Sequence, residues 1–195
     1  MTVLEDRIAM AESDNPITLD SLFERLEKMP VPEGYKVEIV EGTISMSPQR
    51  DAHWEIIAAL YDQLRTRYPR QRVKSDVRID YPGRLNGFAT DLTVIAEGAE
   101  KTAGGQWRHE DVEFAAEVIS KGTATNDYGP KRTAYATAEV AVYLIVDPYQ
   151  GKCHLFTQPK DGDYTTETIV EFGTDVDTTT TPLELTLKTD EFPRD

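Results

Sequence analysis

Apolar positions along the chain form two amphipathic helical patterns and a series of short strand-like runs. Residues 18–29 and 53–68 repeat apolar side chains every three or four positions, which predicts two helices. Pro69 ends the second pattern. Alternating or continuous apolar runs bounded by turn residues predict strands at 37–40, 43–46, 73–79, 90–96, 112–119, 140–146, 152–157, 164–172 and 183–187.

Two of these runs each carry one carboxylate at a position that the pattern expects to be buried. Asp91 stands at the start of the run 92–96, and Glu117 interrupts the run 112–119. A buried charge costs several kcal/mol unless a metal ion, a basic partner or a raised pKa compensates it. Such compensation is common at functional sites, so Asp91 and Glu117 are predicted to lie within reach of one ion.

The alternation in residues 112–119 predicts where Glu117 points. Residues two apart on a strand share a face, so Glu117 lies with Ala115 and Ile119, and the residues between them face the other way. Both faces are mostly apolar, which is typical of a central strand covered on both sides. A carboxylate near the end of such a strand lies where open α/β sheets usually bind ligands.

A second group of polar residues follows at a spacing of four, namely Asp127, Lys131 and Tyr135. This spacing aligns side chains along one side of a helix. Proline is best tolerated in the first helical turn, so the helix is expected at 130–137, with Asp127 ahead of it as a cap or loop ligand. Asp127 and Lys131 could equally form an exposed ion pair with no further role.

The order of these motifs resembles the Uma2 family of restriction endonucleases, within the PD-(D/E)xK nuclease superfamily. The likeness rests on the strand-borne Asp91, the segment Glu117-Val118-Ile119-Ser120, the Asp-x3-Lys-x3-Tyr spacing and a strand that ends in Ile-Val-Asp-Pro. Glu38-Ile39-Val40-Glu41-Gly42 resembles the family's N-terminal Glu-Leu-Ile-x-Gly segment, and a helix that starts near His53 follows it. The family's Pro-Asp is Thr90-Asp91 here, which keeps the carboxylate.

The resemblance implies a restriction-endonuclease-like α/β (α+β) fold, with a central mixed β-sheet flanked by helices and additional β-hairpins. It also implies hydrolysis of phosphodiester bonds with Mg²⁺ or Mn²⁺, and DNA rather than RNA as the partner. Asp91, Glu117 and Glu38 would supply metal ligands, together with the carbonyl of Val118. Asp127, Tyr135 and His53 would support them. Glu38 could otherwise be an ordinary solvent-facing strand residue, and His53 a surface or packing residue.

The lysine is the main departure from the superfamily, because the position of its Glu-x-Lys lysine holds Ile119. The resemblance implies that the helix supplies this lysine, which points to Lys131. Asp127 and Tyr135 would then hold Lys131 in place. Lys121 is the competitor if the strand continues, although the glycine after it suggests that the chain is leaving the sheet.

Length and charge bound the remaining possibilities. With 195 residues the chain fits a single domain, expected at 18–195 after a flexible stretch at 1–17. One cysteine, Cys153, allows no disulfide within a monomer, and the N-terminal stretch has no signal or membrane character. A cytoplasmic protein without membrane contact is expected, and a homodimer is compatible with the sequence.

The net charge of −14, taken over the whole chain, disfavours a partner that carries phosphates. Most of this charge lies in residues 1–33 and in the acidic C-terminal β region at 161–195, and the part between them is close to neutral. Within that part, a basic run could meet nucleic-acid phosphates, or could be a solvated helix end. It consists of Arg65, Arg67, Arg70, Arg72 and Lys74.

Two functions other than a nuclease remain open at this stage. The chain could be a catalytically inactive module that keeps the nuclease-like fold for binding or regulation, because fold does not establish function. Ile119 and the acidic flanks favour this alternative. The chain could also be an acidic interaction protein whose tail mimics or excludes nucleic acid.

Overall fold

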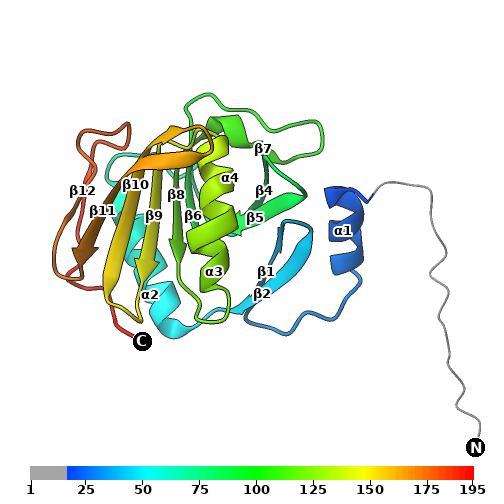
Figure 1. The fold of residues 1–195 in the computed structure, drawn as a ribbon, viewed down its shortest axis with the longest axis horizontal. Coiled ribbons are helices and arrows are strands. Elements are labelled where there is room, and N and C mark those ends of the chain that lie inside the picture. The colour runs from blue at the N-terminus through cyan, green and yellow to red at the C-terminus, as the bar shows by residue number, and fades with distance from the viewer. Residues whose placement is uncertain (1–16) are drawn as a thin grey trace, which may run out of the picture.

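The computed structural model describes residues 17–195, so most of the stretch predicted to be flexible lies outside the described residues. The chain folds into two large β-sheets with helices on their faces and a small sheet of two strands, β12 and β13 (Figure 1). The helices are α1 (Leu19–Leu26), α2 (Asp51–Arg65), the 3-10 turn η1 (His109–Asp111), α3 (Ala124–Asn126), the π-helical turn η2 (Asp127–Lys131) and α4 (Arg132–Thr137). The strands are β1 (Tyr35–Val40), β2 (Thr43–Pro48), β3 (Val73–Lys74), β4 (Val77–Tyr81), β5 (Asn86–Thr90), β6 (Leu92–Ile95), β7 (Trp107–Arg108), β8 (Val112–Val118), β9 (Val142–Asp147), β10 (Lys152–Lys160), β11 (Asp163–Glu171), β12 (Val176–Asp177) and β13 (Thr186–Leu187).

The larger sheet has the strand order β11-β10-β9-β8-β6-β3. Strands β8 and β9 are parallel, with Glu117 paired to Ile145, whereas the other neighbours in this sheet are antiparallel. The chain reaches β9 from β8 through α3, η2 and α4, which form the crossover that a parallel pair requires. The predicted central mixed sheet is therefore confirmed, and β8 lies in its middle.

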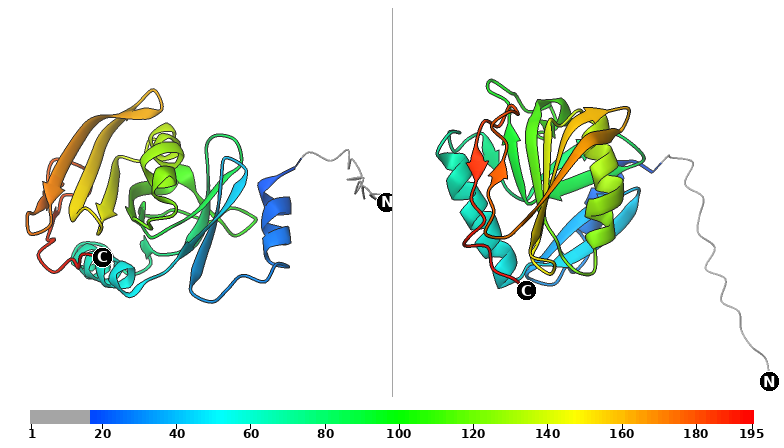
Figure 2. Two further views of the ribbon diagram at one scale, coloured as in Figure 1. Left: turned by 60° about the horizontal axis from the view of Figure 1, so that its bottom comes forward. Right: turned by 60° about the vertical axis from the view of Figure 1, so that its left-hand side comes forward.

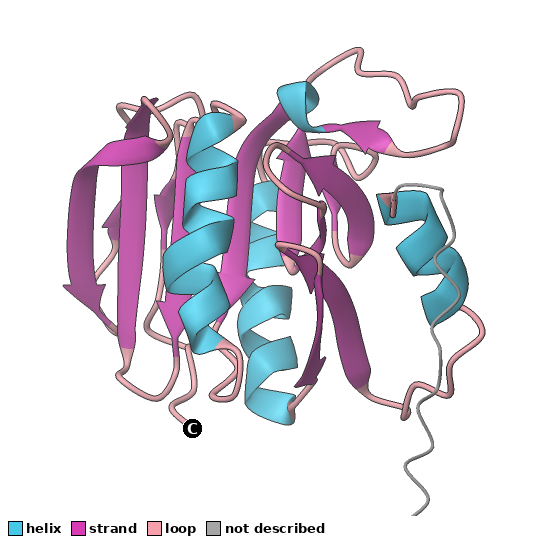
Figure 3. Ribbon diagram, turned by 45° about the vertical axis from the view of Figure 1, so that its right-hand side comes forward, coloured by secondary structure: helices cyan, strands magenta, loops and turns pink. Residues whose placement is uncertain are grey.

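Helices cover both faces of this sheet (Figure 3). On one face, Ile56, Leu60 and Leu64 of α2 pack in one core cluster with Ala116 and Val118 of β8. A second cluster lies on the other face, where Ala115 of β8 and Ile119, which follows this strand, pack with Ala134 and Tyr135 of α4. The alternation predicted for β8 is thus confirmed, and Glu117 faces the α4 side.

The smaller of the two large sheets has the order β2-β1-β5-β4-β7 and lies beside the larger one (Figure 2). Its β1–β2 hairpin turns at Glu41 and Gly42, which both have positive φ, as a two-residue hairpin turn requires. Helix α1 packs on this sheet through Phe23, and a Cβ at Gly87 would come within 2.6 Å of the Phe23 ring. Gly87 therefore permits the close approach of α1 to β5.

The structure corrects the predicted strand at 73–79. The chain instead forms β3 and β4, which belong to different sheets and are separated at Asp76, where φ is +52°. Strand β5 was not predicted, because Gly87 breaks the apolar pattern. Asp91 consequently lies at the junction where the chain leaves β5 in one sheet and enters β6 in the other.

The structure also corrects the start of the helix predicted at 130–137. Helical conformation begins at Ala124, and Pro130 lies inside the π-helical turn η2 rather than at a helix start. Asp127 is therefore the first residue of η2 and not a cap ahead of a helix.

In the acidic C-terminal region, the predicted strand at 183–187 shortens to β13. No helix among the described residues is long and apolar enough to cross a membrane.

Candidate active site

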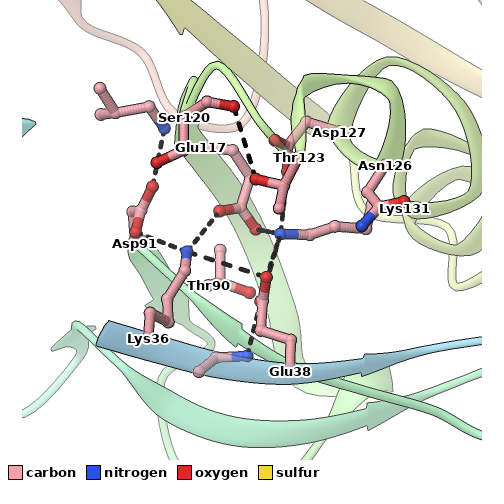
Figure 4. Close-up of polar contacts among 12 residues, drawn as sticks. Lys36, Glu38, Thr90, Asp91, Glu117, Ser120, Thr123, Asn126, Asp127 and Lys131 are labelled. Atoms are coloured by element: carbon pink, nitrogen blue, oxygen red, sulfur yellow. Dashed lines mark hydrogen bonds and ion pairs between the residues drawn. The ribbon is translucent and has the colours of Figure 1, made fainter. Parts of the chain in front are cut away.

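A cluster of buried charged side chains lies where the two large sheets meet. Its residues come from β1, α2, the β5–β6 junction, β8 and η2, as Figure 4 shows for most of them. We call it the charged cluster; it consists of Lys36, Glu38, His53, Asp91, Glu117, Asp127 and Lys131. Every side chain in it is less than a tenth exposed.

Asp91 is held by three donors. His53 Nε2 lies 3.1 Å from Asp91 Oδ2, and the backbone N–H of Val118 donates to the same oxygen over 2.8 Å. Lys36 Nζ lies 2.7 Å from the other oxygen, Oδ1. Burial alone would raise the pKa of Asp91, but Lys36 and His53 outweigh it and hold that pKa below its usual range.

Glu117 is held from two sides. Its Oε1 accepts a hydrogen bond of 2.6 Å from the Tyr135 hydroxyl and lies 2.7 Å from Lys131 Nζ. Its Oε2 lies 3.2 Å from Lys36 Nζ. Burial raises the pKa of Glu117, although the two ammonium groups act in the opposite direction. The sequence predicted that Tyr135 holds Lys131 in place, but its hydroxyl holds Glu117 instead. Thr90 Oγ1 forms a hydrogen bond of 2.8 Å with the same Tyr135 hydroxyl.

Lys131 is enclosed by three carboxylates. Its Nζ lies 2.7 Å from Glu117 Oε1, 2.9 Å from Asp127 Oδ1 and 3.0 Å from Glu38 Oε2. Lys131 Nζ donates hydrogen bonds to Glu38, and the carboxylates of Glu117 and Asp127 are its ion-pair partners. Burial acts to lower the pKa of Lys131, but Asp127, Glu117 and Glu38 outweigh it and raise that pKa well above its usual value.

The alternative reading of Asp127 and Lys131 as an exposed surface pair is wrong, because Lys131 is 1 % exposed and Asp127 is 5 % exposed. The competing lysine lies elsewhere: Lys121 is exposed, and its Nζ lies over the Tyr149 ring. The predicted choice of Lys131 as the lysine beside Glu117 therefore agrees with the geometry.

Lys36 is a member of the cluster that sequence reasoning missed. It bridges Asp91 and Glu117, and its Nζ lies 4.0 Å from Glu38 Oε2. A signal was present, because Lys36 and Glu38 are two apart on β1 and therefore share a strand face. Once Glu38 is assigned to the site, alternation brings Lys36 with it. Glu38 also accepts a hydrogen bond of 2.9 Å from the backbone N–H of Ala89, so it is not a solvent-facing strand residue.

The oxygens of the carboxylate pair show where a metal ion would fit. Asp91 Oδ2 and Glu117 Oε1 are already occupied by protein donors, whereas Asp91 Oδ1 and Glu117 Oε2 converge on the ammonium group of Lys36. These two hard oxygens therefore already share one cation, and they are of the kind that Mg²⁺ prefers. A divalent ion would replace the Lys36 ammonium between them.

The charge balance agrees with this position. Four carboxylates and two ammonium groups make up the cluster besides His53, so two negative charges are in excess when all four carboxylates are ionised. Among residues 17–195, no three acidic, histidine or cysteine side chains form a preformed metal cage. The residues fit an ion held by two carboxylates that completes its shell with water, as magnesium commonly does.

The structure divides the predicted basic run. Arg65 donates to the carbonyl of Tyr68, Arg67 pairs with Glu184, and Arg72 pairs with Glu113 over 2.7 Å. These three arginines therefore bind the protein itself. Arg70 and Lys74 form no ion pair with any residue between 17 and 195, and both line an open cavity of about 490 Å³.

Comparison with known proteins places this fold and site in a family. The model of the family described as "Uma2: Putative restriction endonuclease" matches residues 23–190. The chain belongs to the Uma2 family. This match spans the whole charged cluster, from Lys36 to Lys131.

A solved structure supports the Uma2 fold independently. It is described as a "putative nuclease belonging to DUF820 from Anabaena variabilis ATCC 29413". The two chains superpose with a TM-score of 0.67 at 17 % sequence identity, over 91 % of this chain and 97 % of the other. No curated protein matches the chain. The restriction-endonuclease-like fold expected from the resemblance is therefore confirmed.

Proposed function

We propose that this Uma2 chain is a divalent-metal-dependent nuclease that hydrolyses phosphodiester bonds in DNA. The observation that carries the proposal is the convergence of Asp91 Oδ1 and Glu117 Oε2 on one cation position, with Lys36 Nζ at 2.7 and 3.2 Å. Membership of the Uma2 family supports the same reaction class. A bound Mg²⁺ or Mn²⁺ would offset charge on the scissile phosphate and supply a hydroxide at neutral pH.

The protein's own groups divide into those that hold the carboxylates and those that face substrate. His53 and the Val118 N–H orient Asp91, whereas Tyr135 and Lys131 orient Glu117. Locking the rotamers of reacting groups in this way preorganises a site. We assign these four contacts a positioning role, and the carbonyl of Val118 remains a proposed metal ligand.

The two lysines have different roles in this proposal. Lys131 is 1 % exposed and enclosed by three carboxylates, so it positions Glu38, Glu117 and Asp127 rather than contacting the phosphate. Lys36 borders an open cavity of about 320 Å³, which is also lined by Asp76. A metal ion bound between Asp91 and Glu117 would displace the ammonium group of Lys36, which would then turn toward this cavity and offset the charge that develops on a phosphate there.

A cleavage assay tests this function. Wild type should cut plasmid or single-stranded DNA with Mg²⁺ or Mn²⁺ and stop in EDTA. Asp91→Asn and Glu117→Gln keep the side-chain shape but remove a charge, and each should lower the rate by about 100-fold or more. Asp161→Asn, at an exposed turn, is the matched control and should cut like wild type. Cleavage that persists in both site variants would contradict the assignment.

The inactive-module alternative also has one observation in its favour. Lys36 already bridges Asp91 and Glu117, so the pair has a shared cation without a metal ion. Wild type that binds DNA but cuts no substrate with any divalent metal would favour this alternative. The acidic interaction protein has no such support, because the described acidic C-terminal region forms hairpins away from the cluster (Figure 1).

A further inference from the structure

An exposed tryptophan stands next to the charged cluster. Trp54 is 61 % exposed, although it directly follows His53, which is 4 % exposed and contacts Asp91. Tryptophan is enriched at binding surfaces, because its large ring is apolar on its faces and carries one polar N–H. Trp54 lies in the first turn of α2, which begins at Asp51.

Two cavities extend from Trp54 along α2. The first has a volume of about 420 Å³, and Trp54, Tyr61, Ser75 and Leu92 are among the residues that line it. The second has a volume of about 490 Å³ and shares Tyr61 and Ser75 with the first, so the two are adjacent. Arg70 also lines the second cavity. We call these adjacent cavities the α2 groove.

The α2 groove lies close to the charged cluster. Leu92 follows Asp91 in the chain and Trp54 follows His53, so chain neighbours of two cluster residues line the groove. Ser75 precedes Asp76, which lines the cavity beside Lys36. The cavity beside Lys36 and the α2 groove are thus lined by consecutive residues, which places the groove next to the site.

The far end of the groove is basic. Lys74 and Arg70 line it, and Lys74 Nζ lies 5.1 Å from the centre of the Trp107 ring. One acidic residue, Asp62, lines the part beside Trp54. Aromatic faces that alternate with cationic side chains are the combination that binds single-stranded nucleic acid, because bases stack on the rings and phosphates meet the cations.

We infer that the α2 groove binds a single-stranded segment of nucleic acid that flanks the scissile phosphate, with one base stacked on Trp54 and a phosphate held by Arg70 and Lys74. The inference rests on the proposed function for its ligand, and it adds the path that the strand takes. An unpaired base is required, because a base within a duplex exposes no face for stacking on a side chain.

Tryptophan fluorescence tests the groove directly, without any cleavage. The described residues contain two tryptophans, so Trp107→Phe leaves Trp54 as their reporter. A twelve-nucleotide oligothymidylate added in EDTA should quench the fluorescence of this variant to saturation, and rising salt should weaken the binding. An oligouridylate of equal length shows whether the sugar matters.

Three variants distinguish binding of the oligonucleotide in the groove from its general electrostatic attraction to the protein. Trp54→Ala, measured by anisotropy of a labelled oligothymidylate, should weaken binding by about 5- to 100-fold, which corresponds to the loss of one stacked base. The double variant Arg70→Gln/Lys74→Gln should also weaken it and lower its salt dependence. Lys28→Gln, exposed in the turn after α1, removes one charge outside the groove and should bind like wild type. Circular dichroism should show all three folded, because each replaces side chains that are not buried.

The outcomes distinguish this inference from the proposed function. Quenching by the oligonucleotide without metal-dependent cleavage would support the groove and contradict the nuclease. Cleavage that is unchanged in Trp54→Ala, together with no quenching, would overturn the groove and leave the nuclease. Trp54 fluorescence that changes with protein concentration, before any oligonucleotide is added, would mean that a second copy covers the ring and would also overturn the inference.

Discussion

The Nζ atom of Lys36 lies 2.7 Å from Oδ1 of Asp91, at a position where a cation is shared with Glu117. Burial acts to lower the pKa of Lys36, but Asp91, Glu117 and Glu38 outweigh it and raise that pKa, so the side chain stays charged. The same relationship stabilises the fold without metal and marks the place that a metal ion would take. The two roles oppose each other, because an ion can enter only if the ammonium group leaves.

Replacing Lys36 should separate these roles. Without metal, Lys36→Met should lower the free energy of unfolding by about 3 kcal/mol, because it leaves Asp91 and Glu117 as buried charges without that partner. Added Mn²⁺ should recover part of this loss. Chemical denaturation with and without Mn²⁺ measures both effects, and Lys28→Met, at an exposed position, is the control. A Lys36→Met variant as stable as wild type in EDTA would contradict the assigned contact.

Replacing Lys131 should be more damaging than replacing Lys121. Lys131→Met leaves three buried carboxylates without their shared cation, so the free energy of unfolding should fall by about 3 to 5 kcal/mol. Lys121→Met changes an exposed side chain and should shift it by less than about 0.5 kcal/mol. Urea denaturation of both variants measures the difference. Equal stability of the two would show that Lys131 is not held as described.

The hydroxyl of Tyr135 should contribute to stability through Glu117. Tyr135→Phe keeps the ring in its core cluster but removes the 2.6 Å hydrogen bond, which should cost about 1.5 to 3 kcal/mol. Tyr35→Phe is the matched control, because Tyr35 is 44 % exposed. Thermal unfolding of the two variants compares them. A midpoint for Tyr135→Phe that equals that of the control would argue against the contact.

The single cysteine should be unreactive in the folded protein. Cys153 lies in the core cluster beneath α2, and burial raises the pKa of its thiol to about 12. The thiolate is the reactive form, so at pH 8 almost none is present in the folded chain. A chromogenic disulfide reagent should therefore modify Cys153 slowly in buffer and rapidly in urea. Fast modification without denaturant would show that this part of the core opens.

Periodicity predicted the central strand and its two faces correctly, because β8 is buried on both sides and its pattern has no competing explanation. It did not reveal Lys36, because an exposed-looking lysine in a strand of mixed polarity is the ordinary pattern of a half-solvated hairpin. It also missed the break at Asp76, since positive φ is a property of the turn that tertiary packing selects. Contacts such as that of Tyr135 with Glu117 depend on how η2 is wound, which sequence spacing does not specify.

A calorimetric titration with Mn²⁺ tests the central claim most directly. Wild type should bind one ion, Asp91→Asn should bind it at least about 10-fold more weakly, and Lys36→Met should bind it more tightly than wild type, since no ammonium group has to be displaced. Wild type that binds no ion, or Asp91→Asn that binds as tightly as wild type, would contradict the assignment of Asp91 and Glu117 as a metal site.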